Sequence, residues 1–165
     1  MLPLTLLAAQ KLSDLLTNED ALEQTINSLA VSSGLTVPGI TSNGVVLSSA
    51  GADIADKDMQ LTYPRIALYS TAVKNTQMEK FRSISGIVSV TAELWASANL
   101  LQNTDQWIHF YVEAMTEILR RSIGDWGDGM FFSGVYEVQF QPPKIGGFGY
   151  VESARVVCNV DVSRN

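Results

Sequence analysis

Side chains that carry catalysis are scarce in this sequence. Its 165 residues include one histidine, His109, and one cysteine, Cys158. Nucleophilic catalysis needs a nucleophile next to a base, and a metal centre needs several ligating side chains. A Ser-His-Asp triad and a histidine-rich metal site therefore cannot be assembled in the usual way. We expect no enzyme, no metal site and no cofactor, and a structural or interfacial role for His109.

A single cysteine also excludes a disulfide within the chain. Cys158 stands in a run of alternating apolar residues with Ala154, Val156, Val160 and Val162. Strands that bury one face have this period of two. We therefore expect Cys158 to pack as a small core residue rather than to act as a reactive thiol.

Charge is low and mostly acidic. Charged residues make up 17% of the chain, against about 25% in an average globular domain, and the formal net charge is −6. A protein that grips phosphate backbones needs clustered lysine and arginine. The composition disfavours DNA binding but is compatible with a surface that DNA passes without being bound. The charge deficit suggests that partners cover some uncharged polar surface, although such residues solvate a monomer equally well.

Long hydrophobic runs are also absent. Lys11 and Asp14 interrupt the N-terminal apolar stretch well short of the roughly 20 residues that span a bilayer, and no basic residue precedes it. Its leucines and alanines recur at steps of three and four residues, as one buried helical face requires. We predict an amphipathic helical segment in a protein made and used in the cytoplasm. Asn18 as a cap indicates two helices or one kinked helix, which Gly34 ends.

The chain has no internal repeat, and its length matches one domain. We divide this domain into an N-terminal helical segment (1–33), an extended loop or hairpin arm (34–59) and a sheet–helix core (60–165). In the middle segment, Asn43-Gly44 is a turn signal that predicts a short hairpin. Connections of this length are generally functional or disordered, so we expect any docking arm to lie here.

The core has the order strand, strand, helix, strand, strand. A capping box at residues 103–106 (NTDQ) predicts the start of a helix that ends at Gly124. A wide turn rich in proline and glycine joins the last two strands, which are therefore antiparallel. The predicted fold class is α+β, with an antiparallel sheet of about four main strands packed against the long amphipathic helix. The predicted strands cover 60–72, 82–95, 134–141 and 150–162.

The second strand and the helix have the clearest faces. Along 82–95, apolar residues alternate with Ser85, Ser89, Thr91 and Glu93, which predicts one buried face and one exposed or partner-covered face. The helix has a stripe of apolar residues that we expect to be buried, and charged residues on its other side. The stripe comprises Ile108, Tyr111, Val112, Met115, Ile118 and Leu119.

Two loops resemble ligand sites only superficially. Asp125 and Asp128 lie close together, but calcium loops need more oxygen ligands at regular spacing, so a solvated turn is the better interpretation. The segment 146–149 (GGFG) lacks the lysine and hydroxyl residue of a phosphate-binding loop. A hairpin turn that needs positive φ explains its glycines.

Two tryptophans are candidates for contact anchors. Trp95 ends the second strand on its polar-facing parity, and Trp126 lies in a loop, so both are candidates for partly exposed aromatic residues at a subunit contact. The alternative is that they cap the edges of the core. We hypothesise that an assembly interface includes Arg82, Trp95, Asp125, Trp126, Asp128 and Phe131.

Four stretches of the core resemble the tail terminator proteins of long-tailed bacteriophages, also called tail completion or tail-to-head joining proteins. A long helix across antiparallel strands, in a small acidic chain with loop-rich extensions, is similar in arrangement to this family. The similarity spans about residues 60–161 and is one of pattern and length rather than of a single motif. The stretches are 63–69 (YPRIALY), 85–90 (SGIVSV), 111–114 (YVEA) and 154–160 (ARVVCNV).

The resemblance implies a homo-hexameric ring that caps the last ring of the tail tube, stops its growth and binds the head-side connector or stopper protein. DNA would pass through the lumen without specific binding, and no membrane would be involved. The ring would be assembled in the host cytoplasm and would belong to the tail and neck of the virion. The hypothesised interface residues would then contact neighbouring subunits or the tube.

Other functions fit the same sequence. Within the same class, the chain could be another neck protein, such as a head-completion or stopper protein, or a tube subunit. A helix between the strands favours a terminator over a tube subunit, which usually needs two hairpins for a continuous barrel. From a different class, the alternative is a small-ligand-binding or enzymatic α+β domain with a pocket between helix and sheet.

Overall fold

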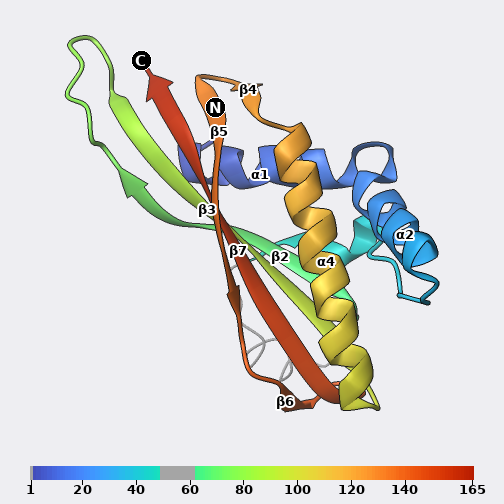
Figure 1. Cartoon of the computed structure of the whole chain (residues 1–165). Coiled ribbons are helices and arrows are strands. Elements are labelled where there is room, and N and C mark those ends of the chain that lie inside the picture. Colours follow the sequence, from blue (N-terminus) through green and yellow to red (C-terminus); the bar gives the residue numbers. More distant parts are fainter. Residues whose placement is uncertain (1, 49–61) are drawn as a thin grey trace.

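The computed structural model describes residues 2–48 and 62–165, and the fold of these residues is α+β, as the sequence predicts. Figure 1 shows helices on one side of a long, curled sheet. The helices are α1 (Leu4–Thr17), α2 (Ala21–Ser33) and α4 (Leu101–Arg121). The strands are β1 (Val45–Leu47), β2 (Arg65–Lys74), β3 (Ile84–Ala98), β4 (Gly124–Gly127), β5 (Met130–Phe140), β6 (Lys144–Gly146) and β7 (Gly149–Arg164).

The sheet has seven strands and is mixed, which corrects the expectation of about four antiparallel strands. The strand order is β1-β2-β3-β7-β5-β4, with β6 paired to β7. The four long strands β2, β3, β7 and β5 are antiparallel neighbours, as predicted, whereas β1 runs parallel to β2. The three further strands have only three or four residues each, too few for alternation to identify them.

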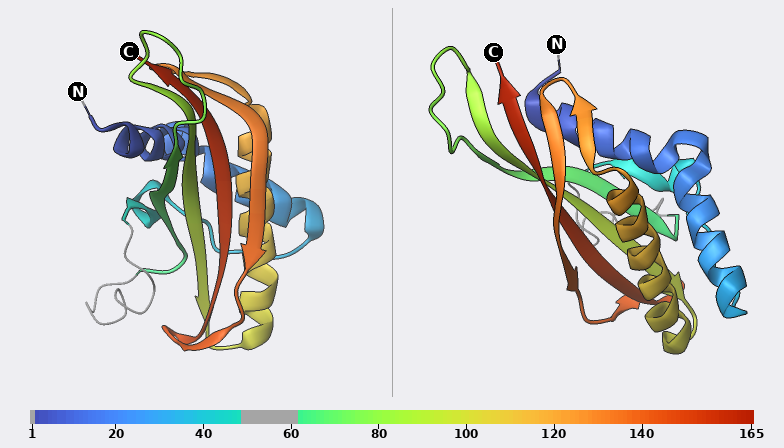
Figure 2. Two further views of the ribbon diagram at one scale, coloured as in Figure 1. Left: turned by 90° about the vertical axis from the view of Figure 1, so that its left-hand side faces the viewer. Right: turned by 45° about the horizontal axis from the view of Figure 1, so that its top comes forward.

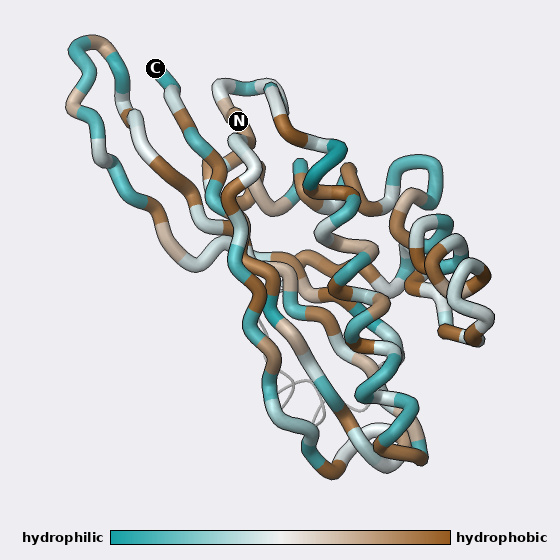
Figure 3. Tube along the Cα trace, viewed as in Figure 1, coloured by the Kyte–Doolittle hydropathy of each residue, from teal (hydrophilic) through white to brown (hydrophobic). Residues whose placement is uncertain are grey.

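The hydrophobic core lies between the helices and one face of the sheet. The predicted apolar stripe of α4 is buried there, against the alternating apolar residues of β3 and β7. This alternation is visible along the long strands in Figure 3. Cys158 is fully buried in the same core, and burial raises the pKa of its thiol to about 12, which confirms its expected packing role.

The predicted capping box is wrong. Helix α4 begins at Leu101, so Asn103 and Thr104 lie inside its first turn, where the Thr104 hydroxyl donates to the Leu101 carbonyl. Near the other end, Arg121 pairs with Glu117, and Arg120 lies 3.7 Å from a carboxylate oxygen of Glu113. These exposed pairs offset the like charges of the two glutamates.

The N-terminal segment forms two helices, as predicted. A short 3-10 turn separates α1 from α2, and in it Glu19 and Asp20 adopt left-handed conformations with φ of 53° and 54°. Asn18 ends α1 and does not cap α2 with its side chain, so that expectation is wrong. Gly34 ends α2 in the left-handed region, with φ of 68°, and its N–H donates to the last turn.

The described part of the predicted loop or hairpin arm is not a hairpin. Asn43 and Gly44 lie in a 3-10 turn, and β1, which follows directly, pairs in parallel with β2. Val37 and Ile40 are buried before this turn, so the segment packs against the core instead of projecting from it. The rest of the predicted arm, residues 49–59, lies outside the described residues.

The loop predicted near residues 125–131 is a tight hairpin between β4 and β5. Asp128 and its two flanking glycines have positive φ, as such a turn requires. Strand β5 therefore begins four residues earlier than the predicted start at Gly134. At the far end of the sheet, Gly147 and Gly149 have positive φ between β6 and β7, which confirms the predicted glycine turn. No helix in the described part of the chain is long and apolar enough to cross a membrane.

Candidate assembly surfaces

Both sides of the sheet end in strand edges that lack a partner strand among the described residues. On one side, β4 pairs only with the first three residues of β5, so residues 133–140 of β5 have a free edge. On the other side, β1 pairs only with β2 positions 66–68, and residues 69–74 of β2 have a free edge. Unpaired edges present rows of N–H and C=O groups that can bind another strand.

The β5 edge can be assigned residue by residue. The Gln141 N–H donates to the Ser153 carbonyl of β7 at 2.9 Å. In an antiparallel pair, alternate residues direct their backbone groups to opposite sides. The backbone groups of Tyr136, Val138 and Phe140 therefore point toward the free side. Their side chains lie on the helix side of the sheet, because their β7 partners belong to the core.

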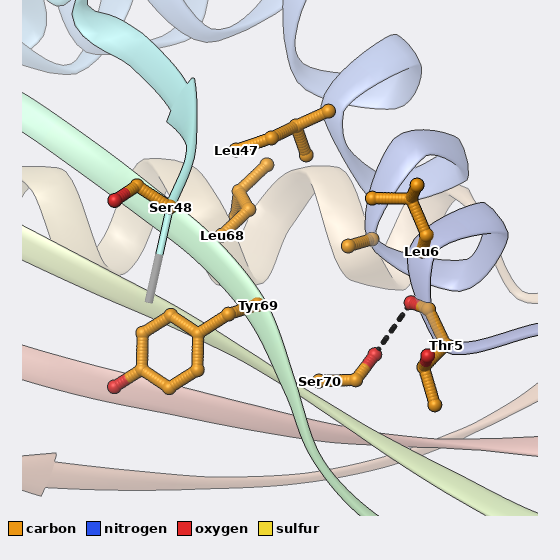
Figure 4. A pocket seen from close by; sticks show the side chains of 8 residues that line it. Thr5, Leu6, Leu47, Ser48, Leu68, Tyr69 and Ser70 are labelled. Carbon is orange, nitrogen blue, oxygen red and sulfur yellow. Dashed lines mark hydrogen bonds between the residues drawn. The ribbon is translucent and has the colours of Figure 1, made fainter. Parts of the chain in front are cut away.

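A small hollow lies next to the β2 edge. It is lined by β2 residues together with Leu6 of α1 and Leu47 of β1, and its volume is 230 Å³. Figure 4 shows the Ser70 hydroxyl donating to the Thr5 carbonyl, a contact of 2.7 Å that fixes α1 to β2 here. Leu6 and Leu47 are exposed, so the end of β1 and the start of the free edge share an apolar surface.

The sheet face opposite the helices, which we call the outer face, is polar. On it, the Tyr69 hydroxyl donates to Glu93 at 3.0 Å, and Arg155 lies 3.6 Å from the other carboxylate oxygen of Glu93. Burial and the neighbouring Glu93 carboxylate raise the pKa of Tyr69. Further along, the Ser89 hydroxyl donates to Asn159 at 2.8 Å. These cross-strand pairs hold β2, β3 and β7 together through polar contacts.

The exposed position expected for Trp95 is wrong. Its side chain is 0% exposed, and the Arg65 guanidinium lies 5.1 Å from the ring centroid. The indole N–H of Trp95 has no hydrogen-bond partner among the described residues. Trp126 is also buried and donates to the Ser122 carbonyl, in accordance with the alternative that tryptophans cap the core. Alternation gave the correct face for Trp95 but not its burial.

Between β2 and β3, residues 75–83 form a projection that we call the arm (Figures 1 and 2). Met78 and Phe81 at its tip are 98% and 87% exposed. Arg82, a predicted interface residue, is exposed beside them, 3.8 Å from Glu79. The sequence did not predict this arm, because residues 73–81 lie between two predicted strands and carry no pattern that indicates a projection.

The other predicted interface residues lie around the β4–β5 hairpin. Asp125 is exposed, and its carboxylate accepts a hydrogen bond from the Gly127 N–H. Asp128 lies 2.9 Å from the Lys11 amine, which lowers the pKa of this carboxyl group. Phe131 is exposed on the outer face. The structure thus gathers Asp125, Trp126, Asp128 and Phe131 at one hairpin, with Arg82 on a separate arm and Trp95 inside the sheet.

A groove lies where this hairpin meets the junction of α1 and α2, and we call it the junction groove. Its volume is 690 Å³. Its lining includes three acidic residues, Asp14, Glu19 and Asp125, together with the apolar residues Leu15 and Trp126. None of these three carboxylates forms an ion pair within the described part of the chain. The sequence did not predict this groove, since its walls come from segments that are far apart in the chain.

Sequence reasoning also missed a carboxyl pair at the opposite end of the sheet. Glu152 is 8% exposed, and its Oε2 atom has no hydrogen-bond partner within residues 2–48 and 62–165. Burial and the nearby Asp105 carboxyl raise the pKa of Glu152 to about 7. The sequence contained an indication of this pair. Glu152 is separated from Ala154 and Val156 by even numbers of positions along the same strand, so it lies on the core face with them. Within 2–48 and 62–165, no group of three or more acidic, histidine or cysteine side chains could hold a metal ion.

An aromatic hollow of 340 Å³ lies near this carboxyl pair, between the start of α4 and the outer face. Tyr63, Trp107 and Phe148 line it, and Tyr63 contacts Phe148 edge to face at 5.8 Å between ring centroids. His109 is exposed on α4 and lies 4.9 Å from the Phe140 ring. No protein-family model matches the chain, and a search of curated proteins gave no match either.

Proposed function

We propose that this chain is a structural subunit of a homo-hexameric ring, the tail terminator of a long-tailed bacteriophage. The ring caps the tail tube, binds the head-side connector and leaves a lumen for DNA in the neck of the virion. It has no catalytic role. The resemblance of residues 60–161 supports the family, and the observation that supports assembly most strongly is the pair of free edges on opposite sides of the sheet.

The two free edges favour a head-to-tail ring. Strands β2 and β5 run in opposite directions, because three antiparallel pairings separate them in the order β2-β3-β7-β5. Rotation about an axis along the strands preserves strand direction, so β5 of one copy meets β2 of the next in antiparallel orientation. Contacts between two different surfaces close into a ring when the rotation divides a full turn.

A six-fold ring of this kind has a wide lumen. Six copies of the four long strands give about 24 strands, more than the roughly 16 to 18 strands that enclose an aqueous channel in porins. With a spacing of about 4.8 Å and a tilt of about 40°, the circumference is about 150 Å and the diameter about 48 Å. This diameter leaves space for duplex DNA inside the side chains.

The outer face suits the wall of such a lumen. The helices cover the other face of the sheet, so the outer face is the one that can face the axis (Figure 2). By register, Glu93, Glu137 and Asp161 lie on it with Arg65, Lys74 and Arg155, so acidic and basic residues are equally numerous on this face of the four long strands. Such a surface binds phosphate backbones weakly, because the cations of these strands are mixed with carboxylates and do not form a cluster that displaces counterions.

Assembly through the β5 edge is tested by removing one outward N–H. Tyr136→Pro deletes a donor on the free side, while Tyr136→Ala removes the same side chain and keeps the donor. Mass photometry and negative-stain imaging of the intact chain should show six-fold rings. We expect Tyr136→Pro to weaken association about tenfold or more relative to Tyr136→Ala, as one lost hydrogen bond predicts.

Equal assembly of the two variants would exclude the β5 edge as the subunit contact, and an intact chain that stays monomeric at every concentration would contradict the ring. A second measurement separates a terminator from another neck protein. Rings should bind the end of purified tail tubes and halt their growth. Binding to the connector alone, without any effect on tube growth, would favour a head-completion or stopper protein.

A further inference from the structure

The arm has a rigid base. The N–H and hydroxyl of Ser83 both donate to the Arg164 carbonyl at the end of β7, at 2.9 and 3.1 Å. Asn75 accepts a hydrogen bond from the Ser85 N–H, and Gln77 donates to the Ser85 carbonyl. The arm is therefore held at its base by backbone and side-chain hydrogen bonds that do not involve Met78 or Phe81.

Gly86 allows the arm to fold back over β3. A Cβ atom at this position would collide with the carbonyl oxygen and carbon of Lys74. Any larger residue would force the base of the arm away from the strand. The close approach and the hydrogen bonds together give the arm one defined direction.

The tip has features of a docking element rather than of a solvated loop. Phe81 has φ of 74°, a left-handed conformation that is unfavourable for a bulky residue, and its ring is exposed. Met78 is exposed beside it. Lys80 lies 5.6 Å from the Phe81 ring centroid, and with Arg82 it outnumbers the one acidic residue, Glu79. The tip is thus apolar and basic on a chain with a net charge of −6.

The junction groove has the complementary character. Leu15 and Trp126 form its apolar wall, and Asp14, Glu19 and Asp125 supply three negative charges. The one lysine in its lining, Lys11, is already paired with Asp128. Glu19 has a left-handed conformation at the junction of the helices and lines the groove there.

Arm and groove lie on opposite sides of one subunit. In Figures 1 and 2 the arm extends beyond the β2 side of the sheet, whereas β4 and the junction of α1 with α2 lie past the β5 side. The arm therefore cannot reach the groove of its own chain. When β2 of one copy meets β5 of the next, the arm extends toward the neighbour's β4–β5 hairpin.

We infer that the arm of each copy docks in the junction groove of the next copy, as a second contact beside the paired strand edges. Phe81 and Met78 bind against Leu15 and Trp126. Lys80 and Arg82 face the three carboxylates, and Arg82 exchanges its weak, exposed pair with Glu79 for them. The inference rests on the proposed ring and names the residues that make its contact specific.

Cysteine pairing tests this contact directly. The variant Met78→Cys is mixed with Asn18→Cys, whose new thiol lines the groove, and the intact chains are oxidised. The native Cys158 is buried and does not compete. We expect heterodimers on mixing, and a ladder up to the hexamer when both changes are in one chain. The control pairs Met78→Cys with Val31→Cys, an exposed position on α2 outside the groove lining, and should give no heterodimer.

Charge reversal gives an independent readout. Arg82→Glu and Asp125→Arg should each weaken ring association about tenfold, and the double variant should recover most of the loss. Rings that form normally but neither cross-link nor respond to charge reversal would overturn the arm-to-groove contact alone. Homodimers of Met78→Cys would overturn it as well, because they require a symmetric contact. Absence of rings in the unmodified chain would overturn the proposed function together with this inference.

Discussion

On the helix-covered face of the sheet, Val88, Val90 and Leu94 of β3 are buried beneath the helices, whereas on the outer face of the same strand Thr91 and Glu93 are buried with polar neighbours. The first face is held by apolar packing and the second by cross-strand hydrogen bonds and ion pairs. Two faces of one strand can thus be equally inaccessible for different physical reasons. Alternation of polar and apolar residues along a strand shows which residues share a face. Whether that face is buried depends on the elements that cover it.

Each face also holds residues of the opposite character, and two of them are buried with an orphan polar atom. Trp95 lies among polar side chains on the outer face, and Glu152 lies on the core side near the start of α4. Both have a buried polar atom without a hydrogen-bond partner. These two residues are where the difference between the faces can be tested most sharply.

The largest effect is expected on the helix-covered face. Leu94→Ala removes a fully buried side chain and leaves a cavity beneath the helices, which costs about 3 kcal/mol of the free energy of unfolding. Chemical denaturation measures this loss. Val73→Ala, at a position exposed near the end of β2, serves as the control and should change stability by less than about 0.5 kcal/mol. A loss below about 1 kcal/mol for Leu94→Ala would contradict the assignment of the core.

A smaller loss is expected on the outer face. Glu93→Gln keeps the size of the side chain but removes the charge that Arg155 and Tyr69 contact, which costs about 1 to 2 kcal/mol. The same change should lower the pKa of Tyr69, because the Glu93 carboxylate is one cause of its raised value. Absorbance titration of tyrosine measures this shift. An unchanged Tyr69 titration would show that the carboxylate does not act on the phenol.

Trp95→Phe should lower the free energy of unfolding by a still smaller amount. Phenylalanine is smaller, so some buried packing is lost, but the substitution also removes the buried indole N–H that has no partner among the described residues. Because these two contributions have opposite signs, the free energy of unfolding should fall by less than about 1 kcal/mol. Trp95→Ala provides the comparison, since it removes the whole ring. Denaturation midpoints of the two variants give the difference. Equal losses for both would mean that the N–H has a favourable contact.

The smallest change in the free energy of unfolding is expected for Glu152→Gln at low pH, where the variant and the native chain should be equally stable. The folded chain raises the pKa of Glu152 from 4.5 to about 7, so between these values the folded state keeps a proton that the unfolded state loses. The free energy of unfolding should therefore fall as pH rises from 4.5 to about 7. Glutamine resembles the protonated form, so the variant should match the native chain at pH 4.5 and exceed it at pH 8. Parallel stability curves across this range would contradict the raised pKa.

Much of the fold could be predicted from local pattern. The order of strands and helix, the apolar stripe of α4 and the Cys158 side of β7 follow from periodicity, which depends only on neighbouring residues. The short strand β4 and the parallel pairing of β1 with β2 depend on distant segments and were missed. The start of α4 was misplaced because Asn103, the cap of the predicted capping box, lies inside a helix that begins at Leu101 without a side-chain cap.

The candidate surfaces were less accessible from sequence. Arg82 and the range 125–131 were proposed as interface residues, and the structure places Arg82 on the exposed arm and 125–131 at the β4–β5 hairpin, where Trp126 and Met130 are buried. The junction groove requires Asp14 and Glu19 to lie beside Asp125, a contact between segments separated by most of the chain. The free edges follow from strand order, because β7 inserts between β3 and β5. No local pattern specifies that insertion.

The long β3–β7 ladder also sets the order in which the molecule can form. Ile84 pairs with Arg164 and Ala98 with Tyr150, so the two central strands are separated in the chain by α4, β4, β5 and β6. Such non-local pairing is slow, because a long loop must close before its contacts stabilise the chain. The β2–β3 hairpin can form locally, because its two strands are close in the chain. Until β7 pairs with β3, the other edge of β3 remains unpaired. Only the pairing of β7 completes the sheet and fixes the base of the arm through the Arg164 carbonyl, so the surfaces proposed for assembly are completed last.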